Sequence, residues 1–176
     1  MSPIDKSRNF ISINIAILTI SDSRTLKNDS SGNLLEERIT NCGHKIIDRQ
    51  IIADDVSIIK KTILNLSSNK LIDTIITTGG TGLTGRDITP EALEEIADKH
   101  IPGFGEVFRT ISLKTVGTSS IQSRACAVLA NGKYIFALPG SSGGVTDAWD
   151  KILIHQLDIN HKPCNFVELF PRLKEK

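Results

Sequence analysis

The sequence predicts an α/β fold in which a largely parallel sheet carries helices on both faces. Short β-branched runs alternate with amphipathic helical segments through the first half of the chain, which is the order of parallel α/β folds. Further along, an Asn-Gly pair separates two apolar runs, which predicts one antiparallel pair of strands in the same sheet. The 176 residues, 39% of them hydrophobic and 23% charged, suffice for a full hydrophobic core.

The first half of the chain is expected to contain three strands and two helices. Residues 13–20, 44–52 and 73–78 are the strands, because each is short, apolar and bounded by polar turns. The first helix begins after the polar residues 29–31 and stops at Gly43. The second follows Asp54 and Asp55, either of which could cap it. The apolar faces of these helices are Leu34, Leu35, Ile39 and Cys42, and then Ile58, Ile59, Ile63, Leu64 and Leu66.

The second half is expected to contain three helices and the hairpin. Thr89 is interpreted as a helix N-cap with Pro90 at the first helical position. Pro102 and Gly103 break the chain before a short helix over residues 104–112, and the last helix spans residues 145–157. The hairpin strands are residues 125–130 and 134–138. Without a repeat or a linker, residues 1–176 are expected to form one domain, with a core of about residues 13–158 and a tail of residues 159–176.

Charge and cysteine content narrow the function classes. The 21 basic and 20 acidic residues give a net charge of +1, so nothing favours a nucleic-acid partner and any anion site must be local. Cys42, Cys126 and Cys164 lie far apart, which suits packing in a reducing compartment better than disulfides or metal binding. Residues 1–10 lack a signal-peptide core, and the run 11–20 is too short and too polar to span a bilayer. We therefore expect a cytoplasmic protein without a membrane partner.

The glycine-rich loop of residues 79–87 is the most informative stretch, because it follows a strand and opens a helix. Glycine N–H groups can approach a phosphate closely, and the helix start adds its positive end. Arg86 could pair with a phosphate, and Asp87 could hold a magnesium ion through water. The loop matches neither common nucleotide-binding motif, and a tight turn without a ligand is the structural alternative. The candidate phosphate-binding residues are Gly79, Gly80, Thr81, Gly82 and Arg86.

Three other polar clusters also follow predicted strands. One is a second glycine-rich loop, and two such loops at one sheet edge could close around a single ligand. The alternative is that this loop is only a turn and a helix entry. The aspartates after the second strand either cap a helix or join Asp87 around a cation. These clusters are Gly140, Ser141 and Ser142, then Ser21 and Asp22, and then Asp54 and Asp55.

Several separated motifs identify a family. Residues 78–82 are Thr-Gly-Gly-Thr-Gly, residues 86–92 are Arg-Asp-Ile-Thr-Pro-Glu-Ala, and residues 138–141 are Leu-Pro-Gly-Ser. Together with Pro-Gly-Phe-Gly-Glu at 102–106 and Ser-Arg-Ala at 123–125, they resemble the signature of the MoaB/MogA molybdenum cofactor biosynthesis family. The resemblance runs from about residue 15 to about residue 157. Residues 108–109, 117–119, 149 and 163–166 look more like MoaB than MogA.

The resemblance implies a three-layer α/β/α sandwich that assembles as a homotrimer or a hexamer. It implies that active members are molybdopterin adenylyltransferases, which join molybdopterin to AMP from Mg-ATP and release pyrophosphate. The two functional aspartates of the family match Asp54 and Asp87, which would act in catalysis and hold Mg²⁺. Ser21, Asp22, Ser141 and Ser142 would line the ligand.

The chain departs from the family pattern at two places. Ala53 stands where the family usually has proline, and residues 141–144 read Ser-Ser-Gly-Gly where adenylylating relatives commonly have Asn/Gln-Pro. The second departure keeps an alternative open, in which the chain is a non-catalytic molybdopterin or nucleotide carrier of the same pathway.

Overall fold

The computed structural model describes residues 4, 5 and 7–175, in which six strands form one sheet in the order β2-β1-β3-β6-β5-β4. β1, β2, β3 and β6 run parallel, and β5 runs antiparallel to both β6 and β4. The strands are β1 Asn14–Ile20, β2 Lys45–Ile52, β3 Thr74–Thr78, β4 Lys99–His100, β5 Cys126–Ala130 and β6 Lys133–Leu138. Residues 1–3, 6 and 176, which fall in the expected leaderless N-terminus and the expected tail, lie outside the described residues.

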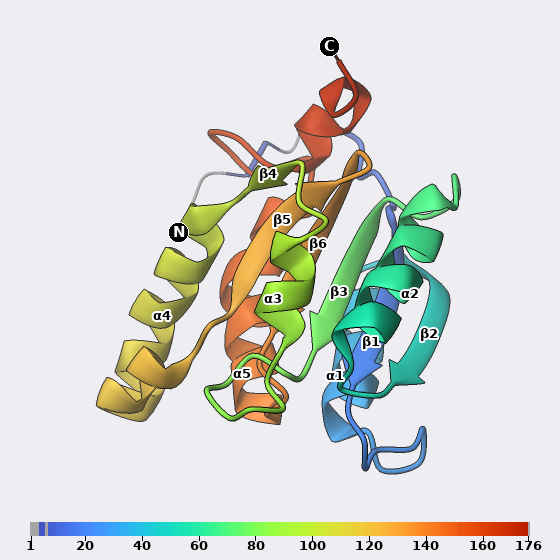
Figure 1. Cartoon of the computed structure of the whole chain (residues 1–176). Helices are drawn as coiled ribbons and strands as arrows, with labels where there is room; N and C mark the ends of the chain where they lie inside the picture. The colour runs from blue at the N-terminus through green and yellow to red at the C-terminus, as the bar shows by residue number, and fades with distance from the viewer. Residues whose placement is uncertain (1–3, 6, 176) are drawn as a thin grey trace.

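Helices cover both faces of this sheet, which confirms the predicted α/β/α sandwich (Figure 1). α1 and α4 pack with α5 on one face, and α2 packs with α3 on the other. The helices are α1 Ser30–Asn41, α2 Val56–Ser68, α3 Thr89–Glu94, α4 Pro102–Val116, α5 Ser142–Ala148 and α6 Ile154–Gln156, with a π-helical turn at Trp149–Leu153 and 3₁₀ turns at Gly117–Gln122 and Val167–Arg172. Within the described part of the chain, no helix is long and apolar enough to span a membrane.

The two hydrophobic layers follow from the alternation of side chains along each strand. In β1, Ile15 and Ile17 join the core under α1, α4 and α5, whereas Ala16 and Leu18 join the core under α2 and α3. Because β1 is buried on both faces, it is apolar almost throughout, as strands of parallel sheets are. The Asn131-Gly132 turn of the β5–β6 hairpin has positive φ at both residues, as a two-residue hairpin loop requires.

Four expectations about individual elements were wrong. Thr89 is the first residue of α3 rather than its cap, because its hydroxyl is used elsewhere. Pro102 starts α4 instead of breaking the chain, and the helix runs for 15 residues. The short strand β4 was missed, so the sheet has two antiparallel pairings rather than one. The last helix begins at Ser142 and contains the π-helical turn.

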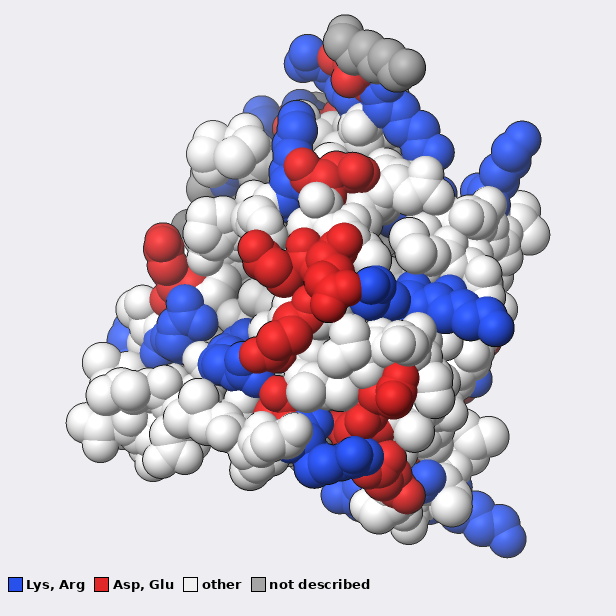
Figure 2. Space-filling model, in the orientation of Figure 1, with Lys and Arg blue, Asp and Glu red and all other residues white. Residues whose placement is uncertain are grey.

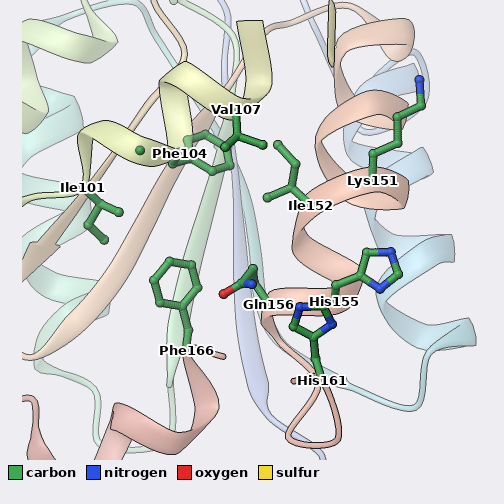
Figure 3. A pocket seen from close by; sticks show the side chains of 10 residues that line it. Ile101, Phe104, Val107, Lys151, Ile152, His155, Gln156, His161 and Phe166 are labelled. Carbon is green, nitrogen blue, oxygen red and sulfur yellow. The ribbon is translucent and has the colours of Figure 1, made fainter. Parts of the chain in front are cut away.

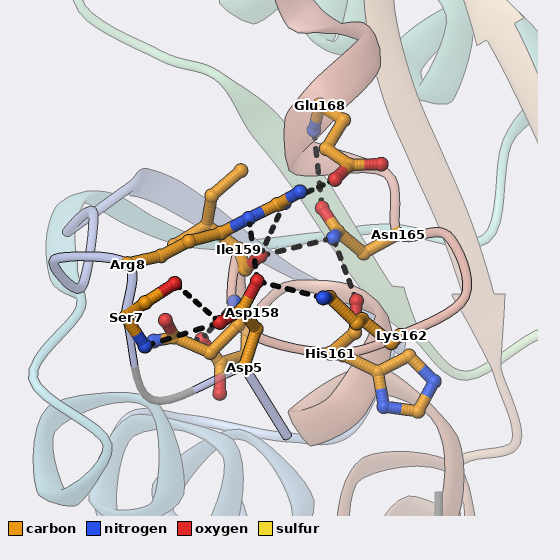
Figure 4. Close-up of polar contacts among 10 residues, drawn as sticks. Asp5, Ser7, Arg8, Asp158, Ile159, His161, Lys162, Asn165 and Glu168 are labelled. Atoms are coloured by element: carbon orange, nitrogen blue, oxygen red, sulfur yellow. Dashed lines mark hydrogen bonds and ion pairs between the residues drawn. The ribbon is translucent and has the colours of Figure 1, made fainter. Parts of the chain in front are cut away.

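Polar contacts join the described part of the tail, residues 159–175, to the start of the chain (Figure 4). Arg8 forms an ion pair with Glu168, and the Lys162 Nζ lies 2.9 Å from the Asp5 carboxylate. The Asn165 amide donates to the carbonyl oxygen of His161 at 3.0 Å, which folds the tail on itself. These contacts lie at the end of the molecule opposite the loops described next (Figure 1).

Candidate functional site

The two glycine-rich loops meet at the carboxyl edge of the parallel strands. The Thr78 hydroxyl donates to the Pro139 carbonyl oxygen at 2.8 Å, and the Gly79 N–H donates to the Leu138 carbonyl oxygen at 3.1 Å. A Cβ built on Gly140 would lie only 3.3 Å from the Gly79 Cα. The expected convergence of both loops at one sheet edge is therefore present, because β3 and β6 are neighbours in the sheet.

The first loop has a backbone that needs glycine at its start. Gly79 and Gly80 have φ values of +104° and +65°, and a Cβ on Gly79 would collide with the carbonyl oxygen of Ile20. Thr89 fastens the turn, since its hydroxyl donates to the Gly79 carbonyl at 2.9 Å and its N–H to the Gly80 carbonyl at 3.0 Å. The shape of this loop is thus fixed by the protein itself.

Asp87 closes the other end of the same loop. Its Oδ2 accepts hydrogen bonds from the Thr84 N–H at 2.8 Å and the Thr84 hydroxyl at 2.6 Å. These bonds lower the pKa of Asp87 against the opposing effect of partial burial. A Cβ on Gly82 would lie 2.8 Å from the same oxygen, so the carboxylate rests directly on the glycine loop. Asp87 is therefore ionised at neutral pH and placed beside the loop amides.

Asp54 and Asp22 join the loops that follow β2 and β1. Each N–H donates to the carboxylate of the other at 3.1 Å, so the two loops are locked in a reciprocal pair. Partial burial and the nearby Asp22 charge raise the pKa of Asp54. The Asp54 N–H and Arg86 instead lower the pKa of Asp22. Asp55 has a different task, since it caps α2 by accepting from the Ile58 N–H at 2.9 Å. Of the two consecutive aspartates, Asp54 is the one that faces the glycine loop.

Arg86 is exposed and pairs with the Asp22 carboxylate. The sequence suggested a phosphate partner, whereas in the structure the guanidinium joins the glycine loop to the loop after β1. Because the side chain is 66% exposed, it can turn toward an anion at little cost.

The other predicted ligand-binding residues differ in their surroundings, and several of them form local hydrogen bonds. Ser141 caps α5 by accepting from the Gly144 N–H at 3.2 Å, and Ser142 lies exposed with its hydroxyl 3.4 Å from that of Ser30. The Ser21 hydroxyl accepts from the Ser23 and Arg24 N–H groups, which shapes the turn after β1. Thr81 is only 3% exposed, and its carbonyl oxygen accepts a hydrogen bond from the Arg124 N–H at 2.9 Å.

Arg124 is the organising residue that the sequence reading did not single out. Its Nε donates to the Gly82 carbonyl oxygen at 2.7 Å and its Nη2 donates to the Asp87 carbonyl oxygen at 2.5 Å. Its Nη1 pairs with Glu91, and its own N–H donates to the Thr81 carbonyl oxygen at 2.9 Å. A single arginine thus holds both ends of the loop. The only sequence signal was its place in the Ser-Arg-Ala motif.

Two hollows flank the glycine loop. Beside the second loop lies a cavity of about 470 Å³, which Pro139, Ser141 and Ser123 help to line. On the other side, the loops after β1 and β2 border an open hollow of about 500 Å³ that Ser21, Asp22 and Ala53 help to line. The sheet order places the glycine loop of β3 between them. The glycine loop is therefore bordered by a separate space on each side.

A separate cavity of about 420 Å³ lies away from these loops (Figure 3). Phe104, Ile152 and Phe166 give it apolar surface, and His155 and His161 also line it. None of its lining residues belongs to the four loops at the carboxyl edge. This cavity is therefore separate from the candidate site.

Acidic side chains gather over α3 on the face that Figure 2 shows. The nearby Glu91 and Glu94 would repel an anion, so attraction has to come from the loop amides and Arg86. Among the described residues, no three His, Cys, Asp or Glu side chains are placed to hold a metal ion unaided. Asp54 and Asp87 nevertheless fit Mg²⁺, which commonly uses one or two carboxylates together with substrate phosphates.

Comparison with known proteins gives the family. The family model described as "Probable molybdopterin binding domain" matches residues 16–159. The chain is 41% identical over 169 residues to "Molybdenum cofactor biosynthesis protein B" of Escherichia coli K12, covering 96% of this chain and 98% of the relative. The chain belongs to the MoaB/MogA molybdenum cofactor biosynthesis family.

Solved structures of this family have the same fold. A crystal structure of a molybdenum cofactor biosynthesis protein B superposes with a TM-score of 0.86 at 36% identity, covering 96% of this chain and all of the other. The tungsten cofactor synthesizing protein MoaB from Pyrococcus furiosus gives a TM-score of 0.72 at 31% identity, covering 81% of this chain and 91% of the other. The family resemblance drawn from the motifs is thus confirmed, as is the fold class.

Proposed function

We propose that this MoaB/MogA-family protein acts in molybdenum cofactor biosynthesis as a molybdopterin adenylyltransferase that uses Mg-ATP. The observation that carries the proposal is the prebuilt glycine loop, which lies between two hollows and has Asp54 and Asp87 beside its amides. A phosphate-binding loop between two ring-sized spaces suits a reaction that joins a phosphorylated pterin to a nucleotide. The family and the names of the relatives support the pathway.

The protein's part in this reaction is positioning and charge neutralisation. A terminal phosphate oxygen of molybdopterin attacks the α-phosphorus of ATP. A new P–O bond forms, the bond to the β-phosphate oxygen breaks, and pyrophosphate leaves with the bonding electrons. The N–H groups of Gly80 and Gly82 would hold phosphate oxygens, because the Gly79 N–H is already bonded to the Leu138 carbonyl oxygen. Arg86 would leave Asp22 and pair with the charge that develops on the phosphate groups. No protein nucleophile is required.

Asp54 and Asp87 would hold Mg²⁺, which neutralises phosphate charge when bound. The raised pKa of Asp54 supports this role, because a cation would relieve the repulsion that raises it. We also propose that the protein works in the cytoplasm as a homotrimer or a hexamer, as the family resemblance implies.

The direct test supplies the protein with Mg-ATP and molybdopterin, and measures adenylylated pterin together with released pyrophosphate. Asp87→Asn should abolish turnover while circular dichroism stays unchanged. Asp55→Asn is the matched control, because asparagine caps a helix as well as aspartate does. Absence of product from the wild-type protein, while an active relative works beside it, would refute the enzyme function.

A second function is favoured by the second loop. Ser141 and Gly144 both make local structural contacts, since Ser141 caps α5 and Gly144 lies against Pro139. If the contacts that relatives make with Asn/Gln-Pro are lost here, the protein would carry molybdopterin without converting it. Calorimetry separates the two functions, because tight pterin binding without pyrophosphate release is expected only of a carrier.

A further inference from the structure

The cavity beside the second glycine loop combines apolar surface with hydroxyl groups. Phe108, Val116 and Pro139 give it apolar surface, and hydroxyl groups from the end of α4, from Gly117–Gln122 and from α5 surround that surface. Its volume of about 470 Å³ is in the range of small-molecule sites. Such a site usually contains a few polar groups that fix the orientation of the ligand.

Asp147 is the one carboxylate on the wall of this cavity, and its side chain is only 9% exposed. The Thr115 hydroxyl donates to its Oδ2 at 2.7 Å, and the Lys151 Nζ donates to its Oδ1 at 2.6 Å. Burial raises the pKa of Asp147, but these two partners outweigh burial and the pKa is lowered. The group is therefore ionised and acts only as an acceptor. Two of its four lone-pair positions are unused by these partners.

A buried carboxylate with spare acceptor positions favours a ligand with two adjacent N–H donors. The 2-amino-4-oxopyrimidine ring of a pterin has such a pair at its 2-amino group and N3–H. Adenine does not, because its amino group lies beside an acceptor nitrogen. We propose that Asp147 is a specificity-determining residue that receives the paired N–H donors of the pterin ring in this cavity. The inference rests on the proposed function and assigns one of its two ring sites.

Two residues that line the cavity are also linked to the glycine loop, which a pterin phosphate would have to reach. Pro139 lines the cavity and also accepts the hydrogen bond from Thr78 at the start of the glycine loop. Ser123 lines the other side and precedes Arg124, which holds the far end of that loop. A pterin with its ring at Asp147 would thus direct its phosphorylated side chain toward the loop amides.

The test measures binding of free pterin and of lumazine by fluorescence titration. Lumazine has an oxygen at position 2, so it lacks the donor pair and presents an acceptor to the carboxylate. The wild-type protein should prefer pterin, and Asp147→Asn should weaken pterin binding about 10- to 100-fold, the range for losing charge-assisted hydrogen bonds. That variant should also lose the preference over lumazine, which a purely structural role would not change.

Two controls separate recognition from folding. Lys151→Gln removes the ion pair but keeps the Asp147 carboxylate, so this variant should still prefer pterin over lumazine. Asp150→Asn changes an exposed neighbouring carboxylate and should bind both ligands as the wild type does. Equal affinity of wild type for both ligands, or unchanged pterin binding by Asp147→Asn, would overturn the assignment. Pyrophosphate release is measured on the same samples, so a protein that shows the preference without turnover refutes only the adenylyltransferase function.

Discussion

Replacing Arg124 by lysine should loosen the glycine loop of residues 79–87 without unfolding the protein. The guanidinium donates to two loop carbonyl groups, those of Gly82 and Asp87, and pairs with Glu91. Lysine retains the charge but has a single nitrogen, so at least one carbonyl loses its donor. A hydrogen bond from a charged group contributes about 1.5–3 kcal/mol. The Glu91 pair adds less than about 1 kcal/mol, because both side chains are substantially exposed.

We therefore expect Arg124→Lys to reduce the stability of the ordered loop by about 2 kcal/mol, which corresponds to roughly 30-fold weaker binding of a ligand that needs it. Calorimetric titration with Mg-ATP measures the affinity. Hydrogen exchange measures protection of the Thr84 and Asp87 amides, which are bonded within the loop. The exchange at those two amides should accelerate, while the amides of β1 remain protected.

The matched control is Arg109→Lys. Arg109 donates to the Ser123 and Ala125 carbonyl groups and does not contact the glycine loop. Glu91→Gln removes only the ion pair and should change affinity by a few-fold at most. If Arg124→Lys binds Mg-ATP as the wild type does and its loop amides keep their protection, the loop is not held by this arginine and the reasoning is wrong.

Substitutions at three further positions, Asp29, Asp54 and Gly79, test the contacts around the glycine loop and the helix that follows β1. Asp29→Ala should lower the free energy of unfolding by about 3 kcal/mol, because it removes the N-cap of α1 and one of the two carboxylate partners of Arg49; urea denaturation measures this. The pKa of Asp29 is lowered because its hydrogen bonds outweigh the effect of burial. The stabilisation from the ionised Asp29 is therefore present above about pH 4 and is lost as the pH falls through the lowered pKa. Asp29→Asn should weaken the loss of stability that the protein shows at acidic pH. Asp54→Asn should raise the melting temperature at pH 7, because a carboxyl group with a raised pKa makes folding less favourable as the pH rises through that pKa. The same variant should lose any stabilisation by Mg²⁺, and an unchanged response to Mg²⁺ would contradict this. Gly79→Ala should abolish binding of Mg-ATP in a calorimetric titration, whereas Gly85→Ala, which meets no atom within 4 Å, should bind it normally.

The parts of the fold that were predictable depend on local pattern. Strand β1 and helix α1 were identified because their signals are local: the apolar periodicity and the cap at Asp29 or its neighbours each depend on only a few consecutive residues. The hairpin was identified because Asn131-Gly132 can adopt positive φ at low energy. Strand β4 was missed because Lys99 pairs with Leu129 and His100 with Val128, 30 and 28 positions away, and a strand of two residues shows no periodicity.

The candidate site was predictable to the extent that topology fixes where loops meet. Loops after parallel strands share one edge, so Asp54, Asp87 and Gly140 could be grouped from the sequence alone. The roles of Arg124 and Asp147 could not be deduced, because their partners lie on other elements and a lone arginine or aspartate has no distinctive local pattern. The burial of Thr81 was likewise not predictable, since it depends on tertiary packing.

The arrangement of charges at this edge also indicates when an anion can bind. Three carboxylates, those of Asp22, Asp54 and Asp87, border a loop whose amides favour a negative group. Arg86 already neutralises Asp22, which leaves the other two to repel a phosphate. A divalent cation between them and the phosphate turns that repulsion into attraction on both sides. Affinity for a phosphorylated ligand should therefore depend on Mg²⁺ more strongly than the stability of the fold does, because the fold already accommodates the two carboxylates through hydrogen bonds to Thr84 and Asp22.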